Sequence, residues 1–328
     1  MGDRSDWTLL HARFHQTLRQ RNLLPKQATI LIAISGGQDS LCLGKLLLDL
    51  QSKWSWQIAV AHCDHHWKSD AGIAEHVQQV ANNWQVPIYL KEAQALKETE
   101  AAARKWRYQA LVEIAQERDF KYIVTGHTLS DRAETFLYNL IRGAGADGLS
   151  SLSWQRFITE QIQLVRPLLN VFRQETLEFC QQFQLPIWFD AVNNNPKYAR
   201  NRIRGDLIPY LRNNFNPQVE NSLAQTAELL RADVEYLEDE AQKLLAQAVS
   251  SDNNQLNRTL LRNVPLALQR RVIRQFLPKI IGKSPNYEQI EAVVSLINAP
   301  NKSRTSSLPG SAIAEVKGDW IVCQKNCY

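Results

Sequence analysis

Two adjacent glycines follow an apolar segment near the start of the chain. The apolar run 30–34 ends there, and a second apolar run, 41–48, follows at helical spacing. Glycines let the backbone approach a ligand with no Cβ in the way, and free N–H groups at a helix start favour an anion, usually phosphate. The segment therefore predicts a nucleotide-binding loop with hydroxyl donors and one carboxylate for Mg²⁺. Its residues are Ser35, Gly36, Gly37, Gln38, Asp39 and Ser40, with Asp39 as the Mg²⁺ ligand.

The spacing excludes two other phosphate-binding patterns at this loop. Gly44 and Lys45 are followed by Leu46, where a Walker A loop requires serine or threonine. The loop also lacks the G-x-G-x-x-G of dinucleotide-binding folds. The alternative is a plain turn between strand and helix, in which serine and aspartate serve as helix caps.

A second polar stretch, GHTLSDRAET, begins at Gly126 after another predicted strand. Asp131 and Glu134 are three residues apart at the front of a predicted helix, so they share a face near the positive end of the helix dipole. Helix capping alone would explain Asp131. Together with His127, the two carboxylates fit a substrate or Mg²⁺ site better.

Polar side chains also follow the predicted strand 56–63. Open α/β sheets place ligands at the carboxyl ends of their strands, so His62 and Asp64 are expected to line the nucleotide pocket. A zinc site built from these two residues with His65 and His66 is disfavoured, because neighbours on an extended chain point to opposite faces.

Arginines follow in the predicted helix 99–119. Arg104 and Arg107 lie about one turn apart and can share a face. The alternative is a solvated basic face, and Arg107 is better placed for function if it points at the sheet edge.

Farther along, Arg200, Asn201 and Arg204 suit phosphates and base edges, because guanidinium groups bind oxyanions bidentately.

These side chains need strands that end at a common edge. Apolar runs predict strands, and amphipathic spacing predicts helices between them. This alternation is typical of a parallel α/β sheet. Strands are predicted at 30–34, 56–63, 86–90, 121–126 and 162–169, and helices at 6–20, 41–48, 71–84, 99–119 and 173–183.

A turn-rich stretch, 213–217, is predicted to separate two domains. Residues 1–215 would form the nucleotide-binding domain, and residues 216–328 a linker helix with a smaller, mainly helical domain. Near the end of the chain, Lys317-Gly318-Asp319 separates two strand-like runs and predicts a hairpin.

The composition is that of a globular protein, with 44% apolar and 22% charged residues. No apolar run reaches the length needed to span a membrane, and the first residues lack the apolar core of a signal peptide, so a cytoplasmic location is expected. The 5 scattered cysteines predict reduced, mostly structural thiols. The net charge of +5 mildly favours a polyanionic partner.

The quoted motifs resemble a known group of enzymes. S-G-G-x-D-S resembles the pyrophosphate loop of the PP-loop ATP-pyrophosphatases. With GHTLSDRAETFLYNLIRGAG and the segment 62–65, it is similar to the tRNA(Ile)-lysidine synthetase family. DAVNNNPKYARNRIR, which begins at Asp190 and includes Asn193, resembles that family's D-x-x-N-x-x-x-x-Y/F-x-R-N-x-I-R signature. Ser130 and His66 depart from the residues that the family commonly has, an aspartate and a glycine.

The resemblance implies a doubly wound, mostly parallel sheet of the adenine nucleotide alpha hydrolase type. It implies a ligase that uses ATP and Mg²⁺ to join L-lysine to C2 of the wobble cytidine in the CAU anticodon of tRNA(Ile). The reaction would pass through an adenylated cytidine and release pyrophosphate and AMP, converting a methionine-type anticodon into an isoleucine one. It implies no obligate protein partner and no membrane.

The resemblance also implies roles for individual residues. Catalysis is assigned to Asp39, Arg107, Asp131 and Glu134, and nucleotide binding to the loop with His62, Asp64 and His127. Contacts with tRNA or lysine are assigned to Arg104, Arg142, Arg200, Asn201 and Arg204.

Three other functions are open to such a chain. A tRNA thiolase normally uses paired cysteines, and the sequence has no C-x-x-C. A ligase of the asparagine synthetase kind needs a glutaminase domain, which is not seen. An RNA-binding protein with an inert nucleotide fold would have to explain Asp39, Asp131 and Glu134, since carboxylates repel RNA.

Overall fold

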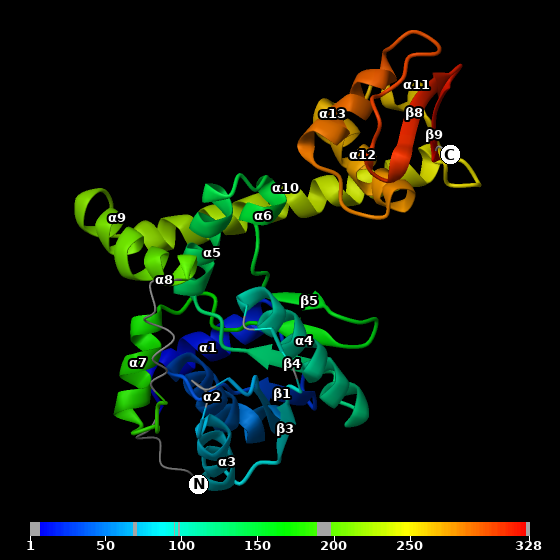
Figure 1. The fold of residues 1–328 in the computed structure, drawn as a ribbon. Coiled ribbons are helices and arrows are strands. Elements are labelled where there is room, and N and C mark those ends of the chain that lie inside the picture. Colours follow the sequence, from blue (N-terminus) through cyan, green and yellow to red (C-terminus); the bar gives the residue numbers. More distant parts are fainter. Residues whose placement is uncertain (1–6, 68–70, 95, 98, 189–197, 326–328) are drawn as a thin grey trace. The chain divides into compact units, whose positions relative to one another are not determined.

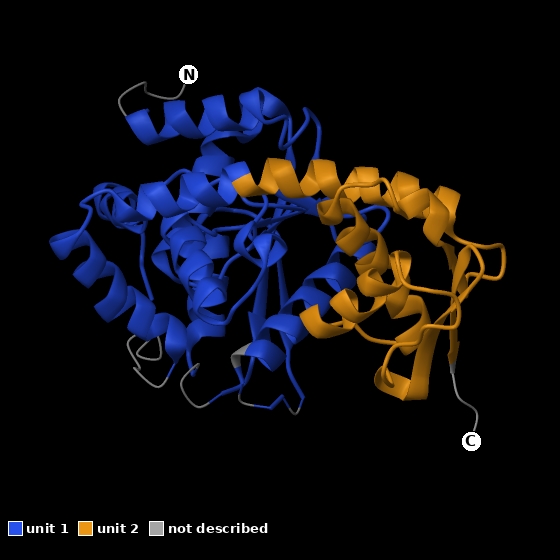
Figure 2. Ribbon diagram, turned by 90° about the horizontal axis from the view of Figure 1, so that it is seen from above, with its two compact units in different colours: residues 1–229 blue, residues 230–328 orange. Residues whose placement is uncertain are grey.

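The computed structural model describes residues 7–67, 71–94, 96–97, 99–188 and 198–325. Asp190 and Asn193 of the family signature lie outside these residues. The chain divides into two compact units, residues 1–229 and 230–328, which Figure 2 colours separately. The division falls inside helix α10 (Val219–Ala248), and the boundary expected from the sequence lies just before that helix.

The first unit is built on a six-stranded sheet with the order β3-β2-β1-β4-β6-β5 (Figure 1). Only β5 runs antiparallel to its neighbour, β6. The mostly parallel α/β sheet expected from the sequence is therefore confirmed. The strands are β1 (Thr29–Ala33), β2 (Gln57–Asp64), β3 (Ile88–Glu92), β4 (Tyr122–Thr125), β5 (Gln155–Phe157) and β6 (Gln163–Val165).

Helices cover both faces of this sheet, because successive side chains of a strand point to opposite faces. On β1, Ile30 and Ile32 belong to the apolar core shared with α1, α2, α3 and α7, whereas Leu31 belongs to the core shared with α4. Burial on both faces explains why this strand is a continuous apolar run. The helices are α1 (Leu9–Gln20), α2 (Gln38–Trp54), α3 (Ile73–Asn83), α4 (Glu100–Glu117) and α7 (Arg173–Gln182).

The strand order reverses beside β1, which is followed in sequence by β2 on one side and flanked by β4 on the other. Ala33 pairs with Ala61 of β2 and with Thr125 of β4, so β1 and β4 end at the same level, and β2 continues beyond it to Asp64. In open α/β sheets such a reversal leaves a crevice at the carboxyl ends, where ligands bind. The segments that follow β1, β2 and β4 therefore meet at one edge.

Two further groups of helices complete the first unit. Helix α5 (Leu129–Ile141) is followed by the short α6 (Ala146–Leu149), and α8 (Ala199–Arg202) continues through a π-helical turn, η4 (Ile203–Leu207), into α9 (Ile208–Asn214). Pro209 lies in the first turn of α9, where a missing N–H is tolerated.

The second unit has its own apolar core, shared by α10, α12 and a three-stranded antiparallel sheet with the order β7-β9-β8. Strands β8 and β9 close at the pair Lys317↔Trp320, and Gly318 in the turn has a φ of +59°. The predicted hairpin is therefore confirmed. The elements are β7 (Gln255–Asn257), α11 (Arg258–Leu261), α12 (Leu266–Ile281), α13 (Tyr287–Val294), β8 (Ala312–Lys317) and β9 (Trp320–Lys325).

The sequence pattern misses two short strands. Strands β5 and β7 have 3 residues each, and all three residues of β5 are exposed, so neither forms a recognisable apolar run. Strand β6 is shorter than the predicted run 162–169, because Pro167 lacks the N–H that a ladder needs. Among the described residues, no helix combines the length and apolar character required to cross a membrane.

Glu228, on α10, joins three side chains of the first unit. Its carboxylate accepts hydrogen bonds from Arg21 Nη1 at 2.8 Å, Arg132 Nη1 at 2.9 Å and Trp154 Nε1 at 3.0 Å. Arg132 is buried, with 4% of its side chain exposed. Burial raises the pKa of Glu228, but the charges of Arg132 and Arg21 outweigh it and hold the pKa below its usual range.

We expect Glu228→Gln to lower the free energy of unfolding of the first unit by about 2 kcal/mol at pH 7, because the buried Arg132 loses its ion pair with Glu228. A lowered folded-state pKa stabilises the protein above the unfolded-state value, so the difference from wild type should narrow as the pH falls below about 4.3. Urea unfolding followed by tryptophan fluorescence measures both effects. Glu235→Gln, on the same helix in an exposed pair with Arg231, is the control. Equal effects of the two variants would contradict the assignment.

Candidate active site

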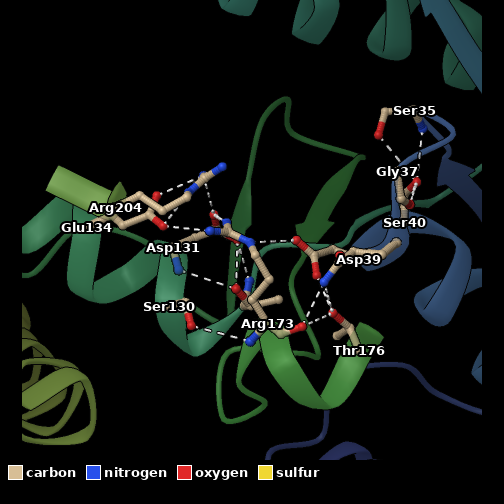
Figure 3. Close-up of polar contacts among 12 residues, drawn as sticks. Ser35, Gly37, Asp39, Ser40, Ser130, Asp131, Glu134, Arg173, Thr176 and Arg204 are labelled. Carbon is tan, nitrogen blue, oxygen red and sulfur yellow. Dashed lines mark hydrogen bonds and ion pairs between the residues drawn. The ribbon is translucent and has the colours of Figure 1, made fainter. Parts of the chain in front are cut away.

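The loop between β1 and α2 is held in shape by its own polar groups (Figure 3). Ser40 Oγ donates to the carbonyl oxygen of Gly37 at 2.8 Å and accepts from the N–H of Ser35 at 3.1 Å. Gly36 has a φ of +84°, a conformation that only glycine adopts without strain. Gly37 is the N-cap of α2, so the first N–H groups of this helix have no intrahelical acceptor and remain available to an anion.

Gly126, at the end of β4, approaches the same loop closely. A Cβ added to Gly126 would lie 2.8 Å from the carbonyl oxygen of Asp39 and 3.1 Å from the backbone N of Ser40. Any larger residue would therefore push away the start of α2. This contact explains why the second polar stretch begins with glycine.

A pocket of about 330 Å³ lies at this edge of the sheet. Residues after β1, β2 and β4 line it together with α4, as expected for the carboxyl ends of parallel strands. Eight residues predicted from the sequence line this pocket: Ser35, Gly37, Asp39, Ser40, His62, Asp64, Arg107 and His127. Tyr108 and Trp188 also line it.

Two of the three histidines that line the pocket, His62 and His127, are held in fixed orientations. His62 Nδ1 lies 2.8 Å from the carbonyl oxygen of Ile34, and His127 Nδ1 lies 2.9 Å from Thr125 Oγ1. Burial and the charge of Arg166 lower the pKa of His127 to about 3. His127 is therefore neutral near pH 7 and offers the pocket an imidazole rather than a cation.

Arg173, the first residue of α7, binds carboxylates from two other helices (Figure 3). Its Nε donates to Asp39 Oδ2 at 3.3 Å, its Nη1 donates to Glu134 Oε1 at 2.6 Å, and its Nη2 donates to Asp131 Oδ1. Thr176 donates to the other oxygen of Asp39. One guanidinium group thus fixes the three carboxylates that the sequence marked as chemically important.

The environment gives two of these carboxylates different pKa values. Burial and the nearby charge of Asp131 raise the pKa of Asp39 to about 6, against the opposing effect of Arg173. Burial also acts to raise the pKa of Asp131, but Arg173 and the hydrogen bonds from Thr128 outweigh it and lower that pKa to about 2. Asp131 is therefore an anion throughout the neutral range.

Asp131 serves two purposes at once. Its Oδ2 accepts from the N–H of Thr128 at 2.8 Å, and Thr128 Oγ1 accepts from the N–H of Asp131 at 3.3 Å, which forms a capping box at the start of α5. Its Oδ1 accepts from Arg173. The capping role considered from the sequence is thus present alongside the ion pair.

Glu134 points to a second cavity, of about 520 Å³, which Gln38, Arg173 and Arg204 also line. Arg204 binds Glu134 bidentately, from Nε at 2.8 Å and Nη2 at 3.0 Å. Arg204 lies in the π-helical turn η4, a type of irregularity that is frequent at functional sites. Asp39 lines the first cavity and Arg173 the second, so this ion pair forms part of the wall between them.

The other predicted residues line neither cavity. The carbonyl oxygen of Gly36 accepts from the N–H of Trp188 at 3.0 Å. Arg142 is exposed and donates to the Tyr138 hydroxyl at 2.7 Å, and the Arg200 guanidinium lies 5.5 Å from the centre of the Tyr138 ring. Two more predicted residues line neither cavity. Asn201 lies in α8, and the Arg104 guanidinium lies 5.4 Å from the centre of the Tyr108 ring.

Sequence reasoning missed Arg173, Thr176 and Tyr108. One signal could have marked Arg173: it begins a helix, and a cation at that end is opposed by the helix dipole. Such a placement indicates that anions lie nearby. Tyr108 follows Arg107 directly, but nothing in the pattern distinguishes it from a core aromatic residue.

A glycine loop between β1 and α2, at the point where the strand order reverses, defines a nucleotide-binding site of the PP-loop class. The PP-loop domain family matches residues 9–211 of the chain. The chain is 56% identical to the tRNA(Ile)-lysidine synthase of Nostoc sp. over 96% of its own length and 97% of that protein's. It is 54% identical to the tRNA(Ile)-lysidine synthase of Synechocystis sp. over 96% of its own length and 97% of that protein's. The chain belongs to the tRNA(Ile)-lysidine synthase family of PP-loop enzymes.

More distant proteins agree on the family and the fold. The chloroplastic tRNA(Ile)-lysidine synthase of Pyropia yezoensis is 37% identical over 96% of this chain and 95% of that protein. The solved U34-tRNA thiolase of Methanococcus maripaludis, with its 4Fe–4S cluster, has a TM-score of 0.58 at 15% identity, covering 68% of this chain and 80% of the other. This second likeness concerns the fold alone.

The four cysteines among the described residues are free and buried, as the sequence predicts for structural thiols.

Proposed function

We propose that this enzyme joins L-lysine to C2 of the wobble cytidine in the CAU anticodon of tRNA(Ile), at the expense of ATP. In the first step, O2 of the cytidine attacks the α-phosphorus of ATP and pyrophosphate leaves. In the second, the side-chain amine of lysine attacks C2, AMP leaves and the nitrogen loses a proton. The observation that supports this assignment best is the nucleotide pocket that adjoins the carboxylate cluster through the pair Asp39–Arg173.

The glycine loop suits the leaving pyrophosphate. The N–H groups at the start of α2 are in place before the ligand binds, whereas the hydroxyl groups of Ser35 and Ser40 donate within the loop and would turn to the phosphate when it binds. Preorganised donors stabilise negative charge that develops in a transition state without a cost of reorganisation. Arg107, on the facing helix α4, lines the same pocket and is assigned to the α-phosphate.

Mg²⁺ fits Asp39. This ion is usually held by one or two protein carboxylates together with substrate phosphates. Each oxygen of Asp39 accepts one hydrogen bond, from Thr176 or Arg173, and keeps a second lone pair. The bound ion would supply charge neutralisation for the phosphates.

Lysine is assigned to the second cavity, which Glu134 lines. An amine must lose its proton before it can attack. Asp131, with a pKa of about 2, is a poor base and is suited to orient an ammonium group instead. Arg142, Arg200, Asn201 and Arg204 are assigned to the RNA, whose target base must leave its stack to reach the site.

The decisive experiment incubates the purified protein with radiolabelled lysine, ATP and transcripts of isoleucine and methionine tRNA. We expect label in the isoleucine transcript alone, only when both ATP and Mg²⁺ are present. Label in neither transcript, with RNA binding intact, would instead favour an RNA-binding protein with an inactive nucleotide fold. An isoleucine transcript with its wobble cytidine replaced by uridine controls for the position of attachment.

A further inference from the structure

Tyr108, in the wall of the nucleotide pocket, is surrounded by arginines that the reaction above leaves largely unused. The guanidinium of Arg104 lies 5.4 Å from the centre of the Tyr108 ring, and that of Arg156, on strand β5, lies 5.9 Å from it. The charge of Arg166, just after β6, acts on the Tyr108 hydroxyl. Two separate parts of the first unit, α4 and the β5–β6 hairpin, therefore place cations on one ring (Figure 1).

Among the residues that the structure describes, these cations have no anion to balance them. Within the part of the chain that the structure describes, none of the guanidinium groups of Arg104, Arg107, Arg156 and Arg166 forms an ion pair with a carboxylate. Arg166 is only 2% exposed and donates from Nη1 to the carbonyl oxygen of Ser153 at 2.9 Å. Elsewhere in the same unit, the buried Arg132 is paired with Glu228.

This cluster of arginines around Tyr108 is energetically unfavourable when no anionic ligand is bound. Burial lowers the pKa of Arg166 and of Arg104, and the neighbouring arginines add to the effect. Like charges held together in a site of reduced polarity repel one another, and a buried cation requires a partner. The hydroxyl of Tyr108 is one acceptor and cannot balance four positive charges.

We propose that Arg104, Arg156, Arg166 and Tyr108 form a second phosphate-binding subsite beside the nucleotide pocket, occupied by a backbone phosphate of the RNA substrate. The assignment rests on the proposed function for the identity of the RNA. Guanidinium groups bind phosphate bidentately, and arginines interleaved with an aromatic ring are typical of nucleic-acid contacts.

RNA is favoured over ATP as the source of the phosphate for two reasons. The glycine loop and Arg107 already provide donors for the nucleotide in the same pocket. Arg156 is exposed on β5, the edge strand of the sheet, where a polynucleotide strand can reach it. A phosphate that contacts both Arg156 and Arg166 would anchor the strand that delivers the target base.

The test measures tRNA affinity by filter binding over a range of salt concentrations, with the full-length protein and without ATP. Arg156→Gln should weaken binding severalfold and reduce the slope of log K against log salt by about 0.7 to 0.9, the loss of one phosphate contact. Arg118→Gln is the matched control, because Arg118 is also exposed and also lies over a tyrosine ring, that of Tyr89 at 5.1 Å. It should leave the slope unchanged.

A second measurement, ATP affinity by equilibrium dialysis, separates the two sources of phosphate. Unchanged ATP affinity in Arg156→Gln, with the reduced salt slope, supports an RNA phosphate. Weaker ATP binding with an unchanged slope would assign the subsite to the nucleotide and overturn the RNA assignment. If both quantities match those of Arg118→Gln, no phosphate binds there. Since neither measurement requires turnover, these outcomes are independent of whether lysine is transferred.

Discussion

Asp39→Asn should lower the rate of lysine transfer by about 100- to 1000-fold, the size of effect seen when a preorganised charged or polar group is removed from a transition state. Asparagine keeps the shape of the side chain and the hydrogen bond from Thr176, but it loses the negative charge that Mg²⁺ requires. The affinity for tRNA should stay unchanged. Rates with saturating tRNA, measured over a series of Mg²⁺ concentrations, test this expectation.

Asp49→Asn provides the matched control for Asp39. Asp49 lies on the same helix, α2, and binds His11 and Lys45 instead of lining the pocket. Its replacement should leave the Mg²⁺ dependence of turnover as it is in the wild type. If Asp39→Asn retained full turnover with the same Mg²⁺ dependence, the assignment of the metal to Asp39 would be wrong.

Arg173→Met is expected to have the largest effect on stability, about 3 kcal/mol, because it leaves a cluster of buried carboxylates without their shared cation. Glu134 retains Arg204, whose Nη2 also lies 4.0 Å from Asp131, but Asp39 would lose the arginine that is paired with it while the charge of Asp131 stays nearby. The pKa of Asp39 should rise further, since Arg173 acts to lower it. Chemical denaturation of the first unit measures the loss of stability.

Arg13→Met controls for the loss of an arginine from an ion pair. Arg13 pairs with Glu175 at 2.6 Å, but both side chains are about one-third exposed, so its removal should cost under about 1 kcal/mol. Arg173→Lys keeps the positive charge but cannot reach all three carboxylates at once. Its free energy of unfolding should lie between those of the wild type and Arg173→Met, and its rate of lysine transfer should still be reduced. Equal stability of Arg173→Met and Arg13→Met would show that the cluster does not depend on its guanidinium.

Local patterns were sufficient to predict the order of the elements that build the site. The glycine loop, the strand before it and the helix after it are encoded in about twenty consecutive residues, and the structure places them as expected. The strands that end at Asp64 and at Thr125 were also found from their apolar runs. Parallel strands must end at a common edge, so these residues could be grouped before their contacts were known.

The same patterns could not predict contacts between distant segments. Asp131 and Glu134 are predicted from the sequence to form a substrate or Mg²⁺ site, but their ion pairs with Arg173, about forty residues farther along the chain, are not. Arg204 is predicted from the sequence to contact RNA, but its bidentate binding to Glu134 is not. Such pairs depend on how α5, α7 and η4 pack together, which no local spacing reports.

The sequence by itself determined the phosphate loop, the parallel sheet and the membership of a tRNA-modifying enzyme family, because backbone conformation and strand burial follow from neighbouring residues. Only the tertiary structure decided that one arginine holds three carboxylates and that Arg104, Arg156 and Arg166 gather around Tyr108 with no carboxylate partner among the described residues. Charge interactions depend on distance in space and on burial, and both are set only when the elements pack.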